Sequence, residues 1–320
     1  MFSIEIIILL MLATLFIGIF LGFPTAFVLG GVSLFFGYFF VGPEIYGLFI
    51  TRLFGIMKNY TLLAVPLFLF MGVFMERSGV AERLFHALYL LWGGLKGGLG
   101  VSTVAISALF AAATGVVGAS EVTIGLMALP AMLDKKYSTS LACGSVCAGG
   151  TLGIIIPPSI MIVLYGPIAN ISVGKLFLGA LFPGLLLALL YMIYIAVRCA
   201  LRPQDGPPMP REERNVPLQD KLKELVTSII PPLLLVFAVL GSIFFGIASV
   251  TEAAAVGAIA SMILAACYGR LNFQVLQGAT TRTLSITSMI LLIAIGADLY
   301  STLYIPLRLN EVLTRLFLKQ

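Results

Sequence analysis

The stretch GVVGASEVTIG, residues 115–125, interrupts one of the most apolar parts of the chain. The segment before it, 101–113, and the segment that starts within it, 120–133, would each be roughly 20 Å long as helices, at about 1.5 Å per residue. Neither run is long enough to cross about 30 Å of hydrocarbon alone. The glycines between them allow the backbone to turn. We therefore expect residues 100–134 to form a hairpin of two short helices that enters the membrane and returns. The alternative is one glycine-rich helix packed closely against a neighbour.

The composition of the whole chain indicates an integral membrane protein. Of its 320 residues, 60% are hydrophobic and only 10% are charged, whereas soluble domains are nearer half apolar and a quarter charged. The net charge of +5 agrees with the excess of Lys and Arg that membrane proteins carry on their cytoplasmic side, so it does not indicate nucleic acid. The sequence shows neither a nucleophile–histidine arrangement nor a cluster of metal ligands, and we expect no enzyme.

Stretches of roughly 20 mostly apolar residues predict the membrane-spanning helices. The predicted spans are 4–22, 24–41, 61–76, 139–166, 173–200, 225–247, 250–268 and 284–305. Residues 79–97 mix charge with apolar periodicity and predict a helix along the membrane surface. Residues 201–223 are rich in proline and basic side chains, which predicts a cytoplasmic loop. Counting spans outward from this loop places the amino terminus on the periplasmic side.

Two similar segments predict an inverted repeat. PTAFVLGG (24–31) and VTEAAAVG (250–257) each follow a long apolar helix, and the predicted topology runs them in opposite directions, as in many secondary transporters. The predicted parts are a first repeat, 1–200, the linker, 201–223, and a second repeat, 224–320. The second repeat ends before a second hairpin and a second broken helix, so we expect it to be incomplete. Glu252, after Thr251, is expected to cap its helix.

A second interruption occurs in AGGTLGIIIPPSIM, residues 148–161. Its glycines loosen a helix, and its two prolines remove backbone donors and disfavour the α conformation before them. We expect half-helices on either side of an unwound TLGIIIPP, whose carbonyl oxygens suit a sodium ion, with Thr151 and Ser159 adding hydroxyl groups. A simple proline kink is the alternative.

The predicted hairpin tip combines two opposite helix ends. Ser120 is well placed as an N-cap, with Thr123 three residues further on. Carbonyl groups at the end of the first helix would attract a cation, and amide groups at the start of the second would attract an anion. Glu121 is an acid within an apolar region; it either binds a cation or a proton, or pairs with a neighbour for structural reasons.

These motifs together resemble the large membrane subunit of the tripartite ATP-independent periplasmic (TRAP) transporters. The matching segments, which span essentially the whole chain, are ATGVVGASEVTIG (113–125), LPAML (129–133), AGGTLGIIIPPSI (148–160), FLGALFPGLLLALLY (177–191) and TEAAAVGA (251–258). The tip departs from the family's Ser-Gly-Ser-Ser pattern, since it reads Thr114-Gly115-Val116-Val117. The family's subunits are also longer, so the resemblance implies a chain truncated at its C-terminus.

The resemblance implies an all-α, inverted-repeat ion-transporter-like fold with a re-entrant hairpin and a broken helix. It implies an inner-membrane permease subunit that imports small organic acids by an elevator-type mechanism, with sodium as the coupling ion and no other cofactor. The implied partners are a small membrane subunit, a periplasmic substrate-binding protein, the organic acid and membrane lipids. Carried over, the cation site comprises Thr114, Gly115, Gly118, Gly150, Thr151, Gly153 and Pro157. Substrate is expected near Ser120, with Glu121, Thr123 and Ser159 as further contacts.

Two other functions stay open from the sequence. One is a sodium-coupled carboxylate symporter that works without a binding protein. The other is a membrane fragment that does not transport. A neighbouring gene for a secreted binding protein would favour the permease subunit over the symporter, and the reading frame beyond Gln320 would test the fragment.

Overall fold

The computed structural model describes residues 4–115, 117–210 and 217–307. Within these ranges the chain is helical and has no strand. Six helices of the described part are long and apolar enough to cross a membrane. They are Tyr60–Arg77, Thr139–Ala169, Val173–Leu201, Lys223–Phe244, Val250–Cys267 and Phe273–Thr302. The chain is therefore an all-α polytopic membrane protein, as the composition predicts.

Packing divides the chain into two compact units. One unit comprises residues 1–59 and 285–320, and the other comprises residues 60–284. This division reflects contacts within each unit and differs in kind from the predicted division into repeats, which stays a prediction. The last helix, α14 (Phe273–Thr302), begins in the second unit and ends in the first.

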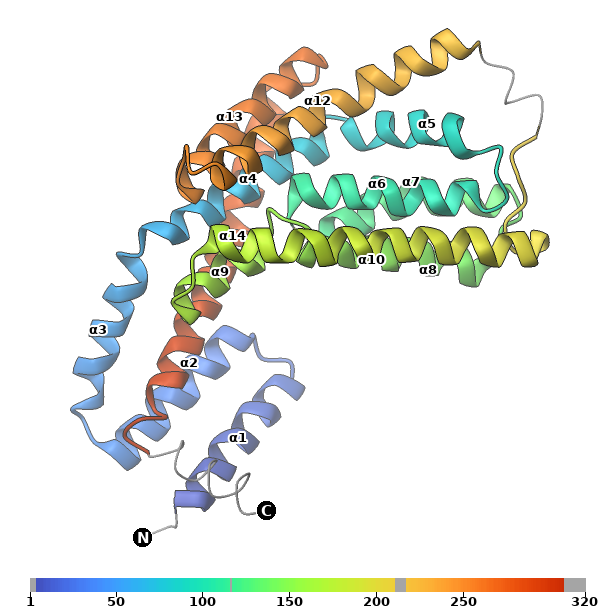
Figure 1. The fold of residues 1–320 in the computed structure, drawn as a ribbon. Coiled ribbons are helices and arrows are strands. Elements are labelled where there is room, and N and C mark those ends of the chain that lie inside the picture. Colours follow the sequence, from blue (N-terminus) through green and yellow to red (C-terminus); the bar gives the residue numbers. More distant parts are fainter. Residues whose placement is uncertain (1–3, 116, 211–216, 308–320) are drawn as a thin grey trace. The chain divides into compact units, whose positions relative to one another are not determined.

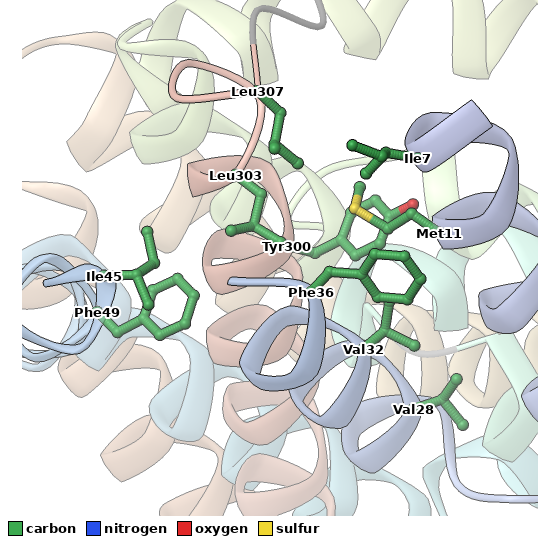
Figure 2. Packing of buried hydrophobic residues seen from close by; sticks show 10 residues of the cluster. All are labelled: Ile7, Met11, Val28, Val32, Phe36, Ile45, Phe49, Tyr300, Leu303 and Leu307. Atoms are coloured by element: carbon green, nitrogen blue, oxygen red, sulfur yellow. The ribbon is translucent and has the colours of Figure 1, made fainter. Parts of the chain in front are cut away.

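The first unit is built from three short apolar helices and the end of α14 (Figure 1). They are α1 (Ile4–Phe20), α2 (Thr25–Phe36), which a π-helical turn (Gly37–Val41) continues, and α3 (Ile45–Met57). The sequence did not predict α3, because its 13 residues are too few to span a membrane. Figure 2 shows the core of this unit. It contains Ile7, Met11, Val28, Val32, Phe36, Ile45, Phe49, Tyr300, Leu303 and Leu307.

The second unit contains the two segments that the sequence predicts to be interrupted (Figure 1). Its helices are α4 (Ala64–Arg77), α5 (Val80–Trp92), α6 (Gly98–Thr114), α7 (Val117–Asp134), α8 (Thr139–Ile155), α9 (Ile160–Ala169), α10 (Val173–Leu201), α12 (Leu218–Phe244) and α13 (Val250–Cys267). Helix α8 packs against α6, α7 and α10, and α4 packs against α13 and α6.

Helices α6 (Gly98–Thr114) and α7 (Val117–Asp134) are the two arms of the predicted hairpin. Helix α6 ends at Gly115, which adopts the left-handed conformation with φ of 62°. Its amide group donates to the carbonyl oxygen of Ala111 at 2.9 Å. This is a common way to end a helix, since glycine enters the left-handed region without steric cost. Helix α7 begins at Val117 and packs against α6, so the chain is not one continuous helix here. Its entry into a membrane stays a prediction.

The second interruption is also present, but it is shorter than predicted. Helix α8 continues to Ile155 and α9 begins at Ile160, so the first five residues of the expected unwound stretch are helical. Only residues 156–159 are non-helical. The predicted unwinding of Thr151 and Gly153 is therefore wrong. Gly149 and Gly150 lie within this helix with neighbouring side chains packed closely on them, whereas the two consecutive prolines end it.

Helix α5 confirms the helix expected within 79–97, although its place on a membrane surface is not tested. Its buried face consists of Val80, Ala81, Leu84, Ala87 and Leu88, which recur at helical spacing. His86, on the exposed side, pairs with Glu224 of α12. The sole histidine of the sequence therefore lies where α5 and α12 meet and connects these two helices through its side chain.

Helix α13 begins with a capping box. The hydroxyl of Ser249 accepts a hydrogen bond from the amide of Glu252 at 3.3 Å, and the Glu252 carboxylate accepts one from the amide of Ser249 at 2.7 Å. Two amide groups that the helix leaves unpaired are satisfied in this way. The prediction that Glu252 serves as a cap is confirmed.

The loop after α10 is fastened to the base of the hairpin. We call residues 205–209 the clasp. Three backbone hydrogen bonds join it to the turns that lead into α6 and α8. The amide of Ser138 donates to the carbonyl oxygen of Asp205 at 3.0 Å, that of Gly97 to Gly206 at 2.9 Å, and that of Met209 to Gly93 at 2.7 Å. This part of the predicted linker is therefore packed against protein rather than free in solvent.

Side chains reinforce the clasp. Arg198 donates from Nε to the Asp205 carboxylate at 3.0 Å. Cys199 is fully buried, and Gly97 and Gly206 both lie against its sulfur atom. Nearby, the buried Tyr137 hydroxyl accepts a hydrogen bond from the amide of Leu99 at 3.2 Å, and burial raises the pKa of Tyr137 to about 12. The start of α6 and the turn after α7 form the base of the hairpin, and both are therefore held in place by the clasp.

Candidate functional site

The hairpin tip consists of the last turn of α6 and Gly115. Thr114 is buried, and its hydroxyl donates to the carbonyl oxygen of Phe110 at 3.0 Å. This local bond engages the hydroxyl hydrogen. The last carbonyl groups of a helix have no partner within that helix, and they carry its partial negative charge. The tip therefore offers a cation backbone oxygen atoms together with the Thr114 hydroxyl oxygen, which keeps its acceptor capacity when its hydrogen is donated.

The break between α8 and α9 offers a second set of backbone groups. Ile156 and Ser159 are both extended, with ψ of 119° and 130°. Between them, Pro157 and Pro158 contribute carbonyl groups but no amide hydrogen. Pro157 also lines an apolar groove of 430 Å³ between α6, α10 and α12. The break is thus enclosed by apolar side chains, in a place where polar groups need a partner.

Ser159 lacks such a partner. Its side chain has no exposed surface, and within the described part of the chain its hydroxyl makes no hydrogen bond. An unsatisfied buried hydroxyl costs about 1–3 kcal/mol. A bound cation would satisfy the oxygen, because a hydroxyl retains acceptor capacity.

The tip and the break are in backbone contact. A Cβ atom at Gly115 would lie 2.7 Å from the carbonyl oxygen of Pro158 and 3.5 Å from the amide nitrogen of Ile160. At the preceding residue of the tip, a Cβ atom at Gly72 of α4 would lie 2.6 Å from the carbonyl oxygen of Thr114. Only glycine permits approaches this close. The carbonyl group of Pro158 therefore lies beside the peptide that joins Thr114 to Gly115.

Glu121 also meets a residue of the predicted cation site. Its partly exposed side chain lies directly on Gly150 of α8, where a Cβ atom would overlap its Cγ atom. The adjacent Gly149 accommodates Ser107 of α6 in the same way. The paired glycines thus let α8 approach both arms of the hairpin, and Gly150 has a packing role that its sequence context alone did not reveal.

The remaining predicted residues lie within helices α7 and α8. Thr151 is exposed and its hydroxyl donates to the carbonyl oxygen of Ala148 at 2.8 Å. Gly153 is buried within α8. Gly118 and Ser120 lie inside the first turns of α7, which begins at Val117. The predicted N-cap role of Ser120 is therefore wrong, because its position is already helical.

Thr123 contacts residues that the sequence did not single out. Its hydroxyl donates to the Glu76 carboxylate at 3.2 Å, and Arg282 donates to the same oxygen at 3.1 Å. Gly72 was also missed. None of the three residues stands out in the sequence. Gly72 and Glu76 lie in the predicted span 61–76, and Arg282 lies just before the predicted span 284–305. The available signal was the spacing of Gly72 and Glu76, which places both on one face of α4.

A hairpin whose tip meets the break of a second helix, in a polytopic membrane protein, is typical of ion-coupled secondary transporters, which place their sites at interrupted helices. Comparison with known proteins agrees with this class. The family model described as "Tripartite ATP-independent periplasmic transporter, DctM component" matches residues 12–320. The chain belongs to this family, which confirms the resemblance, and it is a permease-family protein rather than an enzyme.

Curated relatives from several bacteria are similar to the chain. The C4-dicarboxylate TRAP transporter large permease protein DctM of Pseudomonas aeruginosa is 40% identical over 214 residues, which are 67% of this chain and 48% of the relative. The sialic acid TRAP transporter large permease protein SiaM of Vibrio cholerae is 31% identical over 268 residues, 83% of this chain and 61% of the relative. The ectoine TRAP transporter large permease protein TeaC of Halomonas elongata is 31% identical over 262 residues, 80% and 58% respectively. The chain thus spans about half the length of the first of these.

Proposed function

We propose that the chain forms part of the large permease subunit of a sodium-coupled importer of small organic acids in the bacterial inner membrane. The relatives are named for C4-dicarboxylate, sialic acid and ectoine, and of these we assign an organic carboxylate as the class of substrate. A periplasmic binding protein delivers it, and a small membrane subunit supports the permease. The amino terminus is periplasmic and the loop after α10 is cytoplasmic.

The observation that carries this proposal is the contact of Gly115 with Pro158 beside the unpartnered Ser159 hydroxyl. Sodium is a hard cation that prefers oxygen ligands, and this region offers backbone carbonyl groups and, within the described residues, one hydroxyl without a protein partner. The C-terminal end of α6 contributes favourable partial charge. The N-terminal ends of α7 and α9 are nearby and favour an anionic group, which suits a carboxylate.

The same arrangement supports an elevator-type movement. The hairpin, the broken helix and α10 pack against one another, and the clasp closes the base of the hairpin. A group of elements that is internally fastened can move as one body and carry a bound ion and substrate with it. In the proposed cycle the ion orders the tip, and the tip then encloses the carboxylate.

Sodium binding by the chain itself is the direct test. Thermal unfolding in detergent, followed by the fluorescence of Trp92, is measured in sodium and in potassium chloride at equal ionic strength. A ligand that binds only the folded state at a hundredfold excess over its Kd stabilises that state by about 2.7 kcal/mol. We expect stabilisation by sodium and none by potassium. Equal unfolding temperatures in the two salts at every concentration would contradict the proposed ion site.

Transport is tested in proteoliposomes that contain the chain, the small subunit and the binding protein. We expect uptake of a labelled C4-dicarboxylate only with an inward sodium gradient and only with the binding protein present. Uptake that needs no binding protein would instead favour the symporter. Sodium binding without uptake would identify the chain as a part of the permease that binds the ion but does not complete transport.

A further inference from the structure

Glu76 occupies a three-way junction next to the candidate site. It lies one helical turn after Gly72 on α4, and residues four apart share a helix face. Gly72 meets the hairpin tip at Thr114, while Glu76 accepts a hydrogen bond from Thr123 in the second arm of the hairpin at 3.2 Å. One face of α4 therefore follows the hairpin from its tip into α7.

The same carboxylate oxygen of Glu76 also receives a hydrogen bond from Arg282 of α14. The distance from Arg282 Nη1 is 3.1 Å, and the side chains of Arg282 and Glu76 are 38% and 15% exposed, respectively. One turn earlier on α14, Gly278 lies directly against the guanidinium group of Arg77. The last turn of α4 is thus docked on α14 through two successive charged residues.

This junction differs from the exposed acid–arginine pair that Glu82 of α5 forms with Arg270, just after α13. Glu82 and Arg270 are 3.9 Å apart and their side chains are 67% and 63% exposed. Exposed pairs at such separations contribute little to stability. Glu76, by contrast, is largely buried in an apolar region, where an acid without its partner is strongly disfavoured. Breaking the junction at Glu76 therefore removes the polar attachment of α7 to both α4 and α14.

We propose that Glu76 is a positioning residue for the candidate ion site. Through Thr123 it holds the second arm of the hairpin, and through Arg282 it fixes that arm to α14, so that the tip stays against the break. The inference takes the proposed ion site as its setting. Glu76 is proposed to order the tip already in the absence of sodium, so its role is tested first without sodium.

The test measures amide hydrogen exchange by mass spectrometry on the whole chain in lipid nanodiscs, first in potassium chloride. We expect Glu76→Ala to accelerate exchange of tip and α7 peptides about tenfold. Thr123→Val, which preserves shape and leaves the Glu76–Arg282 pair intact, should accelerate the same peptides about threefold. The double substitution E76R/R282E should restore most of the protection, because the reversed pair attracts equally and a guanidinium at position 76 can donate to the Thr123 hydroxyl.

Two controls make the outcome decisive. Glu82→Ala removes the acid of the exposed pair and should leave hairpin exchange unchanged. Peptides of α12 and α13 report whether each variant is folded. Hairpin exchange at the parent rate in both Glu76→Ala and Thr123→Val would overturn the inference. So would equal acceleration in α12, α13 and the hairpin with Thr123→Val, since that pattern indicates general loosening.

A sodium titration then separates this inference from the proposed function. If sodium protects the tip of the parent, Thr123→Val should require about threefold more sodium for half protection, which loss of bulk stability alone would not produce. If sodium protects neither protein, the ion site fails while the exchange comparison in potassium still decides the role of Glu76. An unchanged sodium midpoint in Thr123→Val, with sodium protection present, would count against positioning.

Discussion

Gly115 at the hairpin tip lies so close to Pro158 in the broken helix that a Cβ atom would come within 2.7 Å of the proline carbonyl oxygen. The two residues are 43 positions apart in the sequence (158 − 115), and each lies where a helix is interrupted. The glycine has no side chain, which allows this close approach, and the proline has no amide hydrogen to donate. Substitutions at this contact, and in the segments that hold it, have distinct expected effects.

Replacing Gly115 by alanine should destabilise the fold and remove the response to sodium. The left-handed conformation costs an L-residue about 1–2 kcal/mol, and crowding against Pro158 adds roughly 1–3 kcal/mol. Gly246 is the matched control, because it has φ of 69° and a Cβ atom there would meet no other atom within 4 Å. Thermal unfolding in sodium and potassium should show the conformational cost in both variants, but loss of sodium stabilisation only in Gly115→Ala.

Ser159→Ala should separate stability from ion binding. Because its buried hydroxyl lacks a partner within the described residues, its removal should stabilise the ion-free protein by about 1 kcal/mol. The same change should weaken stabilisation by sodium if the hydroxyl is a ligand. Unfolding temperatures in the two salts measure both effects. A variant that is destabilised in potassium, or that keeps the full sodium response, would show that Ser159 serves another purpose.

Gly150→Ala should disrupt the approach of α8 to α7, because its Cβ atom would overlap the Glu121 side chain. We expect a loss of about 1–3 kcal/mol in stability. Gly144 lies on the same helix with nothing within 4 Å of a Cβ position, so Gly144→Ala should be neutral or stabilising by up to about 1 kcal/mol. Glu121→Ala should rescue Gly150→Ala. Absence of rescue would indicate that Glu121 is more than a packing partner of this glycine.

Gly206→Cys should form a disulfide bond with Cys199 under mild oxidation. A Cβ atom at position 206 would lie 2.6 Å from the Cys199 sulfur atom, within the reach of such a bond. Mass spectrometry of proteolytic fragments measures the cross-link. Gly241→Cys, at a position with no atom within 4 Å of a Cβ, is the control and should not cross-link to Cys199. A reduced Gly206→Cys protein after oxidation would show that the clasp is open in solution.

The sequence predicts both interruptions because they depend on local chemistry. A glycine at the end of α6 and two prolines after α8 restrict the backbone wherever they occur. The capping role of Glu252 is local in the same sense. The start of α7 was harder, because Ser120 is a good cap in isolation, yet the helix begins earlier at Val117. Helix α3 was missed because its length falls below the threshold for a span.

The contacts of the candidate site depend on packing between distant segments, which single-sequence patterns do not encode. The sequence near Glu76 does not indicate that Thr123 and Arg282 both donate hydrogen bonds to its carboxylate. Likewise, Gly150 and the glycines near it in the sequence predict a loosened helix. In the structure the helix is regular there, and the missing side chain of Gly150 leaves room for Glu121. The family resemblance pointed to the hairpin and the broken helix, whose role as an ion site stays a prediction, and it could not assign the packing of individual residues.

The clasp has a practical consequence for dividing or tagging this protein. A proline-rich connection between two halves is an obvious place for an epitope, a protease site or a split between two genes. An insertion at Gly206 would separate it from Gly97 and Cys199 and so detach the clasp from the base of the hairpin. The same insertion immediately after Met209 would leave those contacts intact. A tag, a protease site or a split between genes is therefore best placed after Met209.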